Sequence, residues 1–336
     1  MQENEIMVSI CCTAFNHEKY IRQTLDGFLM QKTDFKYEVI VHDDASTDQT
    51  AAIIREYETR YPDIVHPIYQ TENQYSKGIL IIKTFLAPEA KGKYVALCEG
   101  DDYWTNPQKL QRQVDALERE KECFMCVHRT EEVKENGEST GVFFPRSELN
   151  EGAISSEDFL PMTVKYSFHT SSYMFDGEKW REYWRNPPEF RRVCPVGDEA
   201  YMLYFGQLGS VYYIPDKMSC YRRGVPSSWS KLQNTGNVFA KSVRLTHQLD
   251  ETLHLYDEYT NYRYHDVCIK RRAYYIKTAR LLEGKTAEFF KKDERELLNA
   301  FPLHHKIILA IAAVFPHLAQ RVYKQRMLNV NKRNGY

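Results

Sequence analysis

Residues 94–102 read YVALCEGDD, an apolar run of strand type that passes directly into three carboxylates around one glycine. Like charges repel, so folding gains nothing by gathering Glu99, Asp101 and Asp102 unless a cation or hydrogen-bond donors compensate. Mg²⁺ and Mn²⁺ take oxygen ligands, often one or two carboxylates together with substrate phosphates. In open α/β sheets, ligands bind beyond the carboxyl ends of the strands, where these acids stand. The stretch therefore predicts a sheet and a metal-dependent site at its edge.

The sequence around this stretch alternates between strand and helix patterns over the first 130 residues. Apolar strands are expected at 7–13, 37–42, 64–69, 94–97 and 123–128, and helices at 17–30, 46–61, 78–87 and 107–120. After Glu131 only short strand patterns remain until a long region of helical period begins near Phe239. This order predicts an α/β fold with a mostly parallel central sheet and a C-terminal helical region.

Composition places the chain among ordinary globular proteins. Its 336 residues are 43% hydrophobic and 27% charged, and the net charge of −1 gives no field that selects a nucleic acid. Residues 1–7 lack a basic region followed by an apolar stretch, and no apolar run is long enough to span a bilayer. Cysteines such as Cys11 and Cys98 lie in apolar runs as small buried hydrophobes. A cytoplasmic location is expected.

The chain is expected to divide near residue 228, where a polar, Gly/Ser-rich stretch begins. Residues 1–228 would form the α/β domain, and 229–336 a helical region with a basic amphipathic tail. No aspartate or glutamate follows Glu296, while cations alternate with apolar residues such as Ile307 and Phe315. Such a tail can lie peripherally on the inner, anionic face of a membrane, or it can pack on its own domain. The helical region either covers the α/β domain or pairs with another copy of the chain.

Two other predicted strand ends also carry polar groups. Asp43 and Asp44 stand at the end of the second strand, before a helix N-terminus where negative charge is favoured. Helix capping does not explain two adjacent acids, so a ligand role is favoured for Asp44, while Asp43 is open between ligand and cap. Thr13 and Phe15 end the first strand, and Phe15 either stacks on a base or belongs to the core.

Four motifs in order resemble those of family 2 glycosyltransferases with the Rossmann-like GT-A fold: TAFN at 13–16, DDASTD at 43–48, KGKY at 91–94 and EGDD at 99–102. The similarity is best over residues 7–130 and extends to about 225. It implies that the mostly parallel central sheet has a small antiparallel part. It also implies metal-assisted single displacement with inversion. A sugar would pass from a nucleotide-diphosphate sugar, expected to be UDP-linked, to a hydroxyl of a glycan or lipid-linked acceptor. The enzyme would be a hexosyl- or N-acetylhexosaminyl-transferase of bacterial surface-polysaccharide type.

The resemblance also implies roles for the residues at the strand ends. Asp44 would hold the nucleotide base, with Thr13 and Phe15 lining that pocket. Asp102 would be the direct ligand of Mn²⁺ or Mg²⁺, and Asp101 would face the ribose or the donor sugar. A divalent ion there would stabilise the charge that develops on the nucleoside diphosphate as it leaves.

Further roles follow from the resemblance over the rest of the chain. Asp198 would be the base that takes the acceptor proton, with Glu199 as the second choice, although helix N-terminal charge explains either acid. Arg222 stands where many relatives have a histidine, and it would clamp the pyrophosphate. Lys77 lies near the pyrophosphate or is a solvated surface lysine. His169 lines the acceptor cleft or is a satisfied structural histidine.

Two other classes of function remain open from the sequence. A nucleotidyltransferase also combines a nucleotide-binding α/β sheet with metal-binding carboxylates, but the acids at 198–199 are less expected there. A non-catalytic nucleotide- or glycan-binding subunit of a synthase complex has no need of a base. Neither class explains the complete set of acids as well as glycosyl transfer does.

Overall fold

The computed structural model describes residues 5–163, 168–226 and 228–333. The chain forms two compact units. The first contains the residues up to Pro187 together with the segment that begins at Tyr204, and the second contains Pro188–Leu203 and the chain from Ser228 onwards. The assignment of Pro188–Leu203 to the second unit was not indicated by the sequence.

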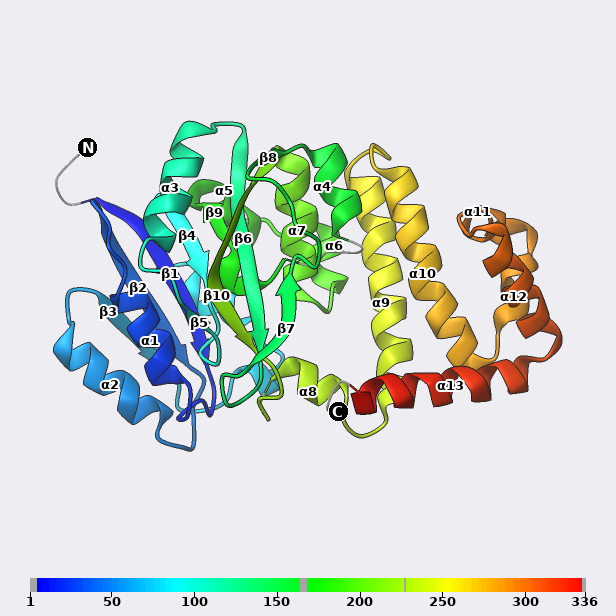
Figure 1. Ribbon diagram of the computed structural model, residues 1–336, viewed down its shortest axis with the longest axis horizontal. Coiled ribbons are helices and arrows are strands. Elements are labelled where there is room, and N and C mark those ends of the chain that lie inside the picture. The colour runs from blue at the N-terminus through cyan, green and yellow to red at the C-terminus, as the bar shows by residue number, and fades with distance from the viewer. Residues whose placement is uncertain (1–4, 164–167, 227, 334–336) are drawn as a thin grey trace. The chain divides into compact units, whose positions relative to one another are not determined.

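One mixed sheet forms the centre of the first unit (Figure 1), with strand order β3-β2-β1-β4-β9-β6-β10-β5, while β7 pairs with β6 and β8 with β10. Strands β3, β2, β1 and β4 run parallel, as do β6 and β10, and the remaining pairs are antiparallel. The predicted α/β fold of GT-A type is confirmed. The strands are β1 (Ile6–Ala14), β2 (Lys36–Asp43), β3 (Val65–Tyr69), β4 (Tyr94–Leu97), β5 (Tyr103–Trp104), β6 (Cys123–Val133), β7 (Ser139–Phe144), β8 (Gly152–Ile154), β9 (Met174–Asp176) and β10 (Ser210–Arg222).

Helices connect the strands of the first unit and cover its sheet. They are α1 (Ile21–Leu29), α2 (Thr50–Arg60), α3 (Lys109–Arg119), α4 (Ser156–Met162) and α5 (Gly177–Arg185), with short turns η1 (Tyr75–Lys77), η2 (Ile82–Leu86) and η3 (Thr170–Ser172). The helix expected at 78–87 is confirmed only in part, because a short π-helix, η2, forms at Ile82–Leu86 and residues 78–80 are not helical. Gly78 takes a positive φ of 78°, and Ile79 and Leu80 stay exposed, so the helix does not begin at residue 78, whereas Ile81 and Leu86 are buried.

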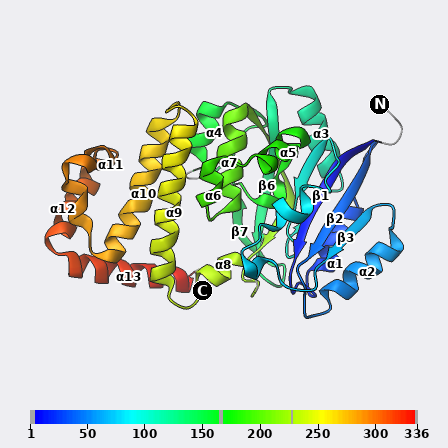
Figure 2. The ribbon, with the colours of Figure 1, turned by 180° about the vertical axis from the view of Figure 1, so that it is seen from behind.

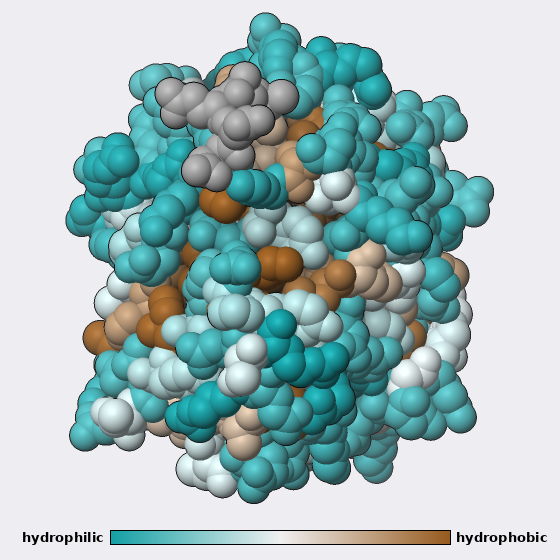
Figure 3. All heavy atoms as spheres, turned by 90° about the vertical axis from the view of Figure 1, so that its left-hand side faces the viewer, coloured by the Kyte–Doolittle hydropathy of each residue, from teal (hydrophilic) through white to brown (hydrophobic). Residues whose placement is uncertain are grey.

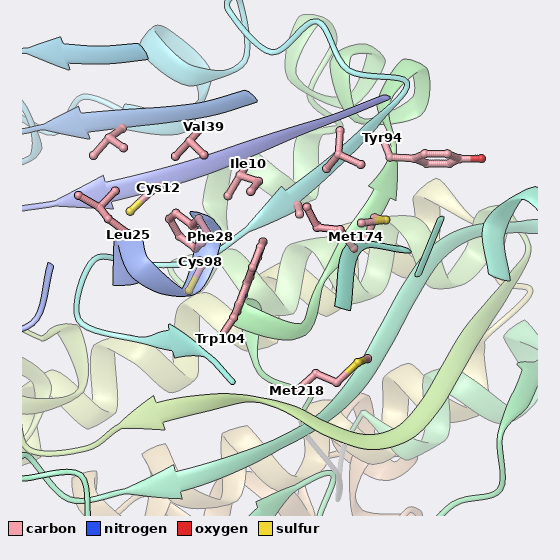
Figure 4. Close-up of a cluster of buried hydrophobic side chains, with 14 of the residues drawn as sticks. Ile10, Cys12, Leu25, Phe28, Val39, Tyr94, Cys98, Trp104, Met174 and Met218 are labelled. Atoms are coloured by element: carbon pink, nitrogen blue, oxygen red, sulfur yellow. The ribbon is translucent and has the colours of Figure 1, made fainter. Parts of the chain in front are cut away.

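Side chains from β1, β2, β4 and α1 fill one core with Trp104 at its centre (Figure 4). The ring of Phe28 packs edge-on against Trp104 with 4.7 Å between centroids. The indole N–H of Trp104 donates to the carbonyl of Ser171 at 3.0 Å, so burial leaves no polar atom of the ring unsatisfied. Burying a ring of this size contributes on the order of 3 kcal/mol. Trp104 therefore anchors the sheet directly after the acidic residues.

The second unit is helical. It consists of α6 (Glu189–Val193), the start of α7 (Gly197–Leu208), α8 (Trp229–Gln233), α9 (Val238–Tyr259), α10 (His265–Glu283), α11 (Arg295–Asn299), α12 (Leu303–Val314) and α13 (Pro316–Arg333), with the short turns η4 (Thr286–Phe290) and η5 (Lys292–Glu294). Helices α9 and α10 lie side by side (Figures 1 and 2).

A histidine links three helices of this unit. His265 contacts Asp257 at 2.6 Å and Glu296 at 2.8 Å, and hydrogen bonds to these two carboxylates raise the pKa of its ring.

Among the helices that the structure describes, none combines the length and apolar character needed to cross a bilayer.

Candidate active site

Parallel pairing brings the ends of β1, β2 and β4 to the same edge of the sheet. Ala14 lies opposite Asp43 in the register of β1 and β2. The amide of Gly100, just beyond β4, donates to the carbonyl of Thr13 at 2.8 Å, and the amide of Asp44 donates to the carbonyl of Ala14 at 3.0 Å. The three polar strand ends singled out in the sequence are therefore fastened to one another by backbone hydrogen bonds.

Three carboxylates converge beyond the end of β4. Glu99, Asp101 and Asp102 each offer an oxygen within 4.8 Å of the others. Asp101 and Asp102 are only 4% and 2% exposed, and Oδ1 of Asp101 has no hydrogen-bond partner among the described residues. Burial raises the pKa of Asp102 well above its usual range, and the negative charges of Asp101 and Glu99 raise it further. An all-oxygen set with an unsatisfied buried oxygen fits a hard divalent cation.

Arg222 fixes the position of these acids from strand β10. Its amide donates to Oδ1 of Asp102 at 2.8 Å, and its Nε donates to the carbonyl of Asp101 at 3.0 Å. The remaining guanidinium nitrogens donate to the carbonyl of Glu135 at 3.0 Å and to Oε1 of Gln23 at 2.7 Å. All three nitrogens of the guanidinium are thus engaged within the protein, and the side chain holds the acidic loop against β10. Its role as a pyrophosphate clamp stays a prediction.

His169 lies beside Asp102, a placement that the sequence did not indicate. Its Nε2 is 3.7 Å from Oδ2 of Asp102, and its ring stacks on Tyr221 with 4.4 Å between centroids. Burial lowers the pKa of His169 to about 3, so the ring is neutral. Because Nδ1 accepts the amide N–H of Ser171 at 3.3 Å, the proton is assigned to Nε2, which faces the carboxylate.

His17 contacts the acidic loop from the end of β1. Its Nε2 is 4.0 Å from Oδ2 of Asp101. A Cβ placed on Gly100 would come within 2.9 Å of Nδ1 of His17 and 3.1 Å of Cβ of Ala14, so only glycine fits at this position. The glycine of the EGDD motif is therefore required by the close approach of the β1 end.

Phe15, two residues before His17, is half-buried.

Asp44 organises the loop that follows β3. Its Oδ1 accepts the amide of Gln74 at 2.8 Å, and its Oδ2 accepts the amide of Tyr75 at 3.0 Å. Lys77 lies in the same loop, half-exposed, and forms an ion pair with Glu72. Asp44 and Lys77 thus lie against and within the same loop at the edge of the sheet. Binding of the base by Asp44 and of the pyrophosphate by Lys77 stay predictions.

Asp43 contributes a second unsatisfied oxygen at this edge. Its Oδ2 accepts the amide of Ser46 at 3.3 Å, while its Oδ1 is buried without a hydrogen-bond partner among the described residues. Asn16 and Ala45 take positive φ values of 56° and 60°, and the amide of Asn16 donates to Oγ of Ser46 at 2.9 Å. Such backbone conformations persist only where the surroundings enforce them, as at binding sites.

The two acids at the start of α7, within the second unit, have different surroundings. Glu199 is buried and forms an ion pair with the buried Arg271. Asp198 is half-buried, and its Oδ1 accepts only the Glu199 amide, at 3.0 Å, among the described residues. Burial, followed by the charge of Glu199, raises the pKa of Asp198 to about 6. Asp198 is therefore the acid of this pair that has an oxygen available and titrates near neutral pH.

An α/β sheet of this topology, with acids gathered beyond the end of β4, defines a protein of the GT-A class. The model of glycosyl transferase family 2 matches residues 9–175, and the chain belongs to that family. The resemblance inferred from the four sequence motifs is confirmed.

Comparisons with individual proteins agree with this assignment. An uncharacterized protein of Mycobacterium tuberculosis is 35% identical over 66% of this chain and 60% of its own length. The Escherichia coli UDP-Glc:alpha-D-GlcNAc-diphosphoundecaprenol beta-1,3-glucosyltransferase WfaP is 32% identical over 44% of this chain and 55% of its own. The chain thus spans about 60% of the first of these relatives. The structure of S. aureus TarS in complex with UDP-GlcNAc covers 95% of this chain and 92% of its own, with a TM-score of 0.58 at 16% identity, and shows a shared fold.

Proposed function

We propose that the protein is an inverting glycosyltransferase that moves a sugar from a nucleotide-diphosphate donor to a hydroxyl of a glycan or lipid-linked acceptor in a bacterial surface polysaccharide. The observation that carries the proposal is the convergence of Glu99, Asp101 and Asp102 beyond β4 in a family 2 chain. A UDP-linked hexose or N-acetylhexosamine is the proposed donor. The names of WfaP, which uses UDP-Glc, and of the TarS complex with UDP-GlcNAc support this choice.

The nucleotide is proposed to bind at the joined ends of β1 and β2. Asp44 would receive the base, and Thr13 and Phe15 would line its pocket. Lys77 would approach the pyrophosphate after release from Glu72, a surface pair whose loss costs little. The proposal rests on the fastening of these strand ends to one edge of the sheet.

A divalent ion, Mn²⁺ or Mg²⁺, would be held by Asp102, with Asp101 and Glu99 within reach. When bound, such an ion stabilises negative charge on the departing nucleoside diphosphate. Asp101 would also face the donor sugar, and its unsatisfied Oδ1 supports a ligand contact there. Arg222 would serve the donor by keeping the acidic loop in place, since a direct contact with pyrophosphate requires one of its present hydrogen bonds to open.

Asp198 is the proposed base. Single displacement needs one group that accepts the proton of the attacking hydroxyl, and such a group works best with a pKa near the operating pH. The raised pKa of Asp198, about 6, suits that task. Glu199 is less suited, because it is paired with Arg271.

The proposed setting is the cytoplasm, at the inner face of the membrane where a lipid-linked acceptor is presented. Pairing of two copies through the helical region 229–336 is the proposed quaternary arrangement. Both proposals are separate from the assignment of the reaction.

The reaction is tested by incubating the full-length protein with UDP-glucose, UDP-GlcNAc and GDP-mannose, with Mn²⁺, Mg²⁺ or EDTA, and measuring nucleoside diphosphate release. We expect slow, metal-dependent release from a UDP sugar by the wild type. Asp102→Asn should lose it, whereas Asp115→Asn, at an exposed acid of α3, should keep it. Pyrophosphate release from a nucleoside triphosphate would instead identify a nucleotidyltransferase, and donor binding without turnover would identify a binding subunit.

A further inference from the structure

Helix α12 buries only one of its faces. Leu309 and Ala312 are buried, and Leu309 packs in the core cluster that contains Ile276 and Phe289. Ile307, Ile311 and Val314 follow the i, i+4, i+7 spacing of a second stripe along the same helix, and Ile308 lies beside it. This second stripe is apolar throughout, yet it remains in solvent.

The exposed stripe continues past the end of α12 into α13. Its members are between 53% and 73% exposed and are here called the tail face: Leu303, Ile307, Ile308, Ile311, Val314, Phe315, Leu318 and Val322. Single exposed apolar residues are normal, but a continuous set of large ones marks an interaction surface. On the face of the first unit seen in Figure 3, by contrast, hydrophilic side chains predominate and apolar ones show only in short, interrupted stretches.

The charge around the tail face is of one sign. Lys306, Arg321, Lys324, Arg326 and Lys332 lie on α12 and α13, and no carboxylate side chain occurs after Glu296. None of these five cations forms an ion pair within the part of the chain that the structure describes. A second copy of the same face would bring like charges together, whereas an anionic surface complements them. The charge pattern thus selects an anionic partner that also accepts apolar side chains.

We propose that the tail face binds the surface of an anionic lipid bilayer. The apolar side chains of α12 and the start of α13 would enter the boundary between headgroups and acyl chains, while Arg321 and Arg326 contact lipid phosphates. Neither helix is apolar enough to cross the membrane, so the segment lies in its plane. The inference rests on the proposed function only in that a lipid-linked acceptor would be met at this surface.

The test measures co-sedimentation of the full-length protein with vesicles of phosphatidylglycerol and phosphatidylethanolamine, against vesicles of phosphatidylcholine alone. Wild type should bind the anionic vesicles and release from them at high salt. Each cation near an anionic surface contributes about 1 kcal/mol, so Arg321→Gln with Arg326→Gln should lower the partition coefficient about thirtyfold. Ile308→Ser with Ile311→Ser should lower it about a hundredfold.

Matched controls remove the same groups elsewhere in the second unit. Lys270→Gln with Lys291→Gln deletes two exposed cations outside the tail face, and Leu232→Ser deletes an exposed apolar side chain of α8. Both controls should bind vesicles as wild type does. Equal losses in the test and control variants would overturn the proposal, because binding would then follow overall charge or hydrophobicity.

Turnover of a soluble donor separates this proposal from the proposed function. The tail-face variants should release nucleoside diphosphate at the wild-type rate without vesicles, because the altered residues lie outside the acidic site. Vesicle binding without donor turnover would support the tail face and contradict the proposed reaction. Turnover without vesicle binding would support the proposed reaction and contradict membrane binding by the tail face. Loss of self-association in Ile308→Ser with Ile311→Ser would identify the tail face as a contact between copies and overturn the proposal.

Discussion

The acid pair beyond β4 and the acid pair at the start of α7 look alike in sequence but differ in what holds them. At the end of β4, the backbone amide of Arg222 donates to Asp102, while Asp101 keeps a buried oxygen that has no hydrogen-bond partner in the described part of the chain. The guanidinium of Arg222 binds the loop backbone instead of a carboxylate. Burial and the neighbouring carboxylates raise the pKa of Asp102, and a bound cation would offset that cost.

At the start of α7, one acid is neutralised within the protein. The Arg271 side chain pairs with Glu199, and Asp198 is left with one oxygen that accepts an amide and one that does not. In this pair an arginine side chain provides a counter-charge for Glu199, and burial raises the pKa of Asp198 to about 6. The two acid pairs thus differ chiefly in the nearest arginine: the Arg271 side chain pairs with Glu199, whereas the Arg222 side chain binds the backbone at Asp101. If the proposed roles hold, this difference is what separates the cation site from the proton acceptor.

The largest expected effect comes from Asp198→Asn. If Asp198 is the base, kcat should fall about a thousandfold, since general-base catalysis typically contributes between a hundredfold and ten-thousandfold. In the wild type, kcat/KM should rise with pH through about 6 and then level off, because the base acts only when deprotonated. The measurement is initial-rate kinetics over pH with the best UDP-sugar donor.

Stability provides the control for that variant. Burial holds the pKa of Asp198 above the unfolded value of about 4. The ionised carboxylate therefore costs stability above that value, and an amide, which cannot ionise, removes the cost. Asp198→Asn should unfold no more readily than wild type at pH 7. Near-normal turnover by this folded variant would exclude Asp198 as the base.

The next effect in size concerns the partner acid. Glu199→Gln leaves the buried Arg271 guanidinium without its counter-charge, and we expect the free energy of unfolding to fall by about 3 kcal/mol. Glu251→Gln, at an exposed position of α9, should change it by less than about 0.5 kcal/mol. Urea titration measures both. If Glu199→Gln kept its stability but lost turnover, the assignment of roles within this pair would have to be exchanged.

Local patterns predicted most of what lies along β1, β2 and β4. An apolar strand followed by acids is visible in a few consecutive residues, and parallel pairing then places such strand ends together. The helix expected at 78–87 formed only at Ile82–Leu86, because Ile79 and Leu80 fit the helical pattern but lie exposed with no surface to pack on. Local composition cannot show whether a partner surface is present.

Contacts between distant segments could not be predicted from the sequence. Nothing near residue 169 indicates that this histidine faces Asp102, and nothing near 271 indicates that this arginine pairs with Glu199. Helical period shows which side of α10 is buried, but the identity of the facing residue depends on the assembled fold. For the same reason Arg222 could be assigned to the site from its motif, but its hydrogen bonds to the acidic loop could not.

The smallest expected effect tests the cation side of the comparison through His169. The neutral His169 ring lies with Nε2 3.7 Å from Oδ2 of Asp102, longer than a hydrogen bond, and we expect this contact to limit the orientation of the carboxylate without adding charge. Partners that orient a metal ligand typically contribute tenfold to a hundredfold in metal affinity. His169→Ala should therefore weaken Mn²⁺ binding about tenfold, measured by calorimetric titration of the full-length protein without donor.

Two further variants separate orientation from packing in this test. His169→Gln retains an N–H donor and should recover much of the affinity, whereas His66→Ala, at an exposed position of β3, should not alter it. A merely structural histidine would change the melting temperature of His169→Ala without a selective loss of metal affinity. Unchanged Mn²⁺ affinity in folded His169→Ala would mean that His169 does not set the orientation of Asp102, which would then depend on the Arg222 amide that donates to its Oδ1.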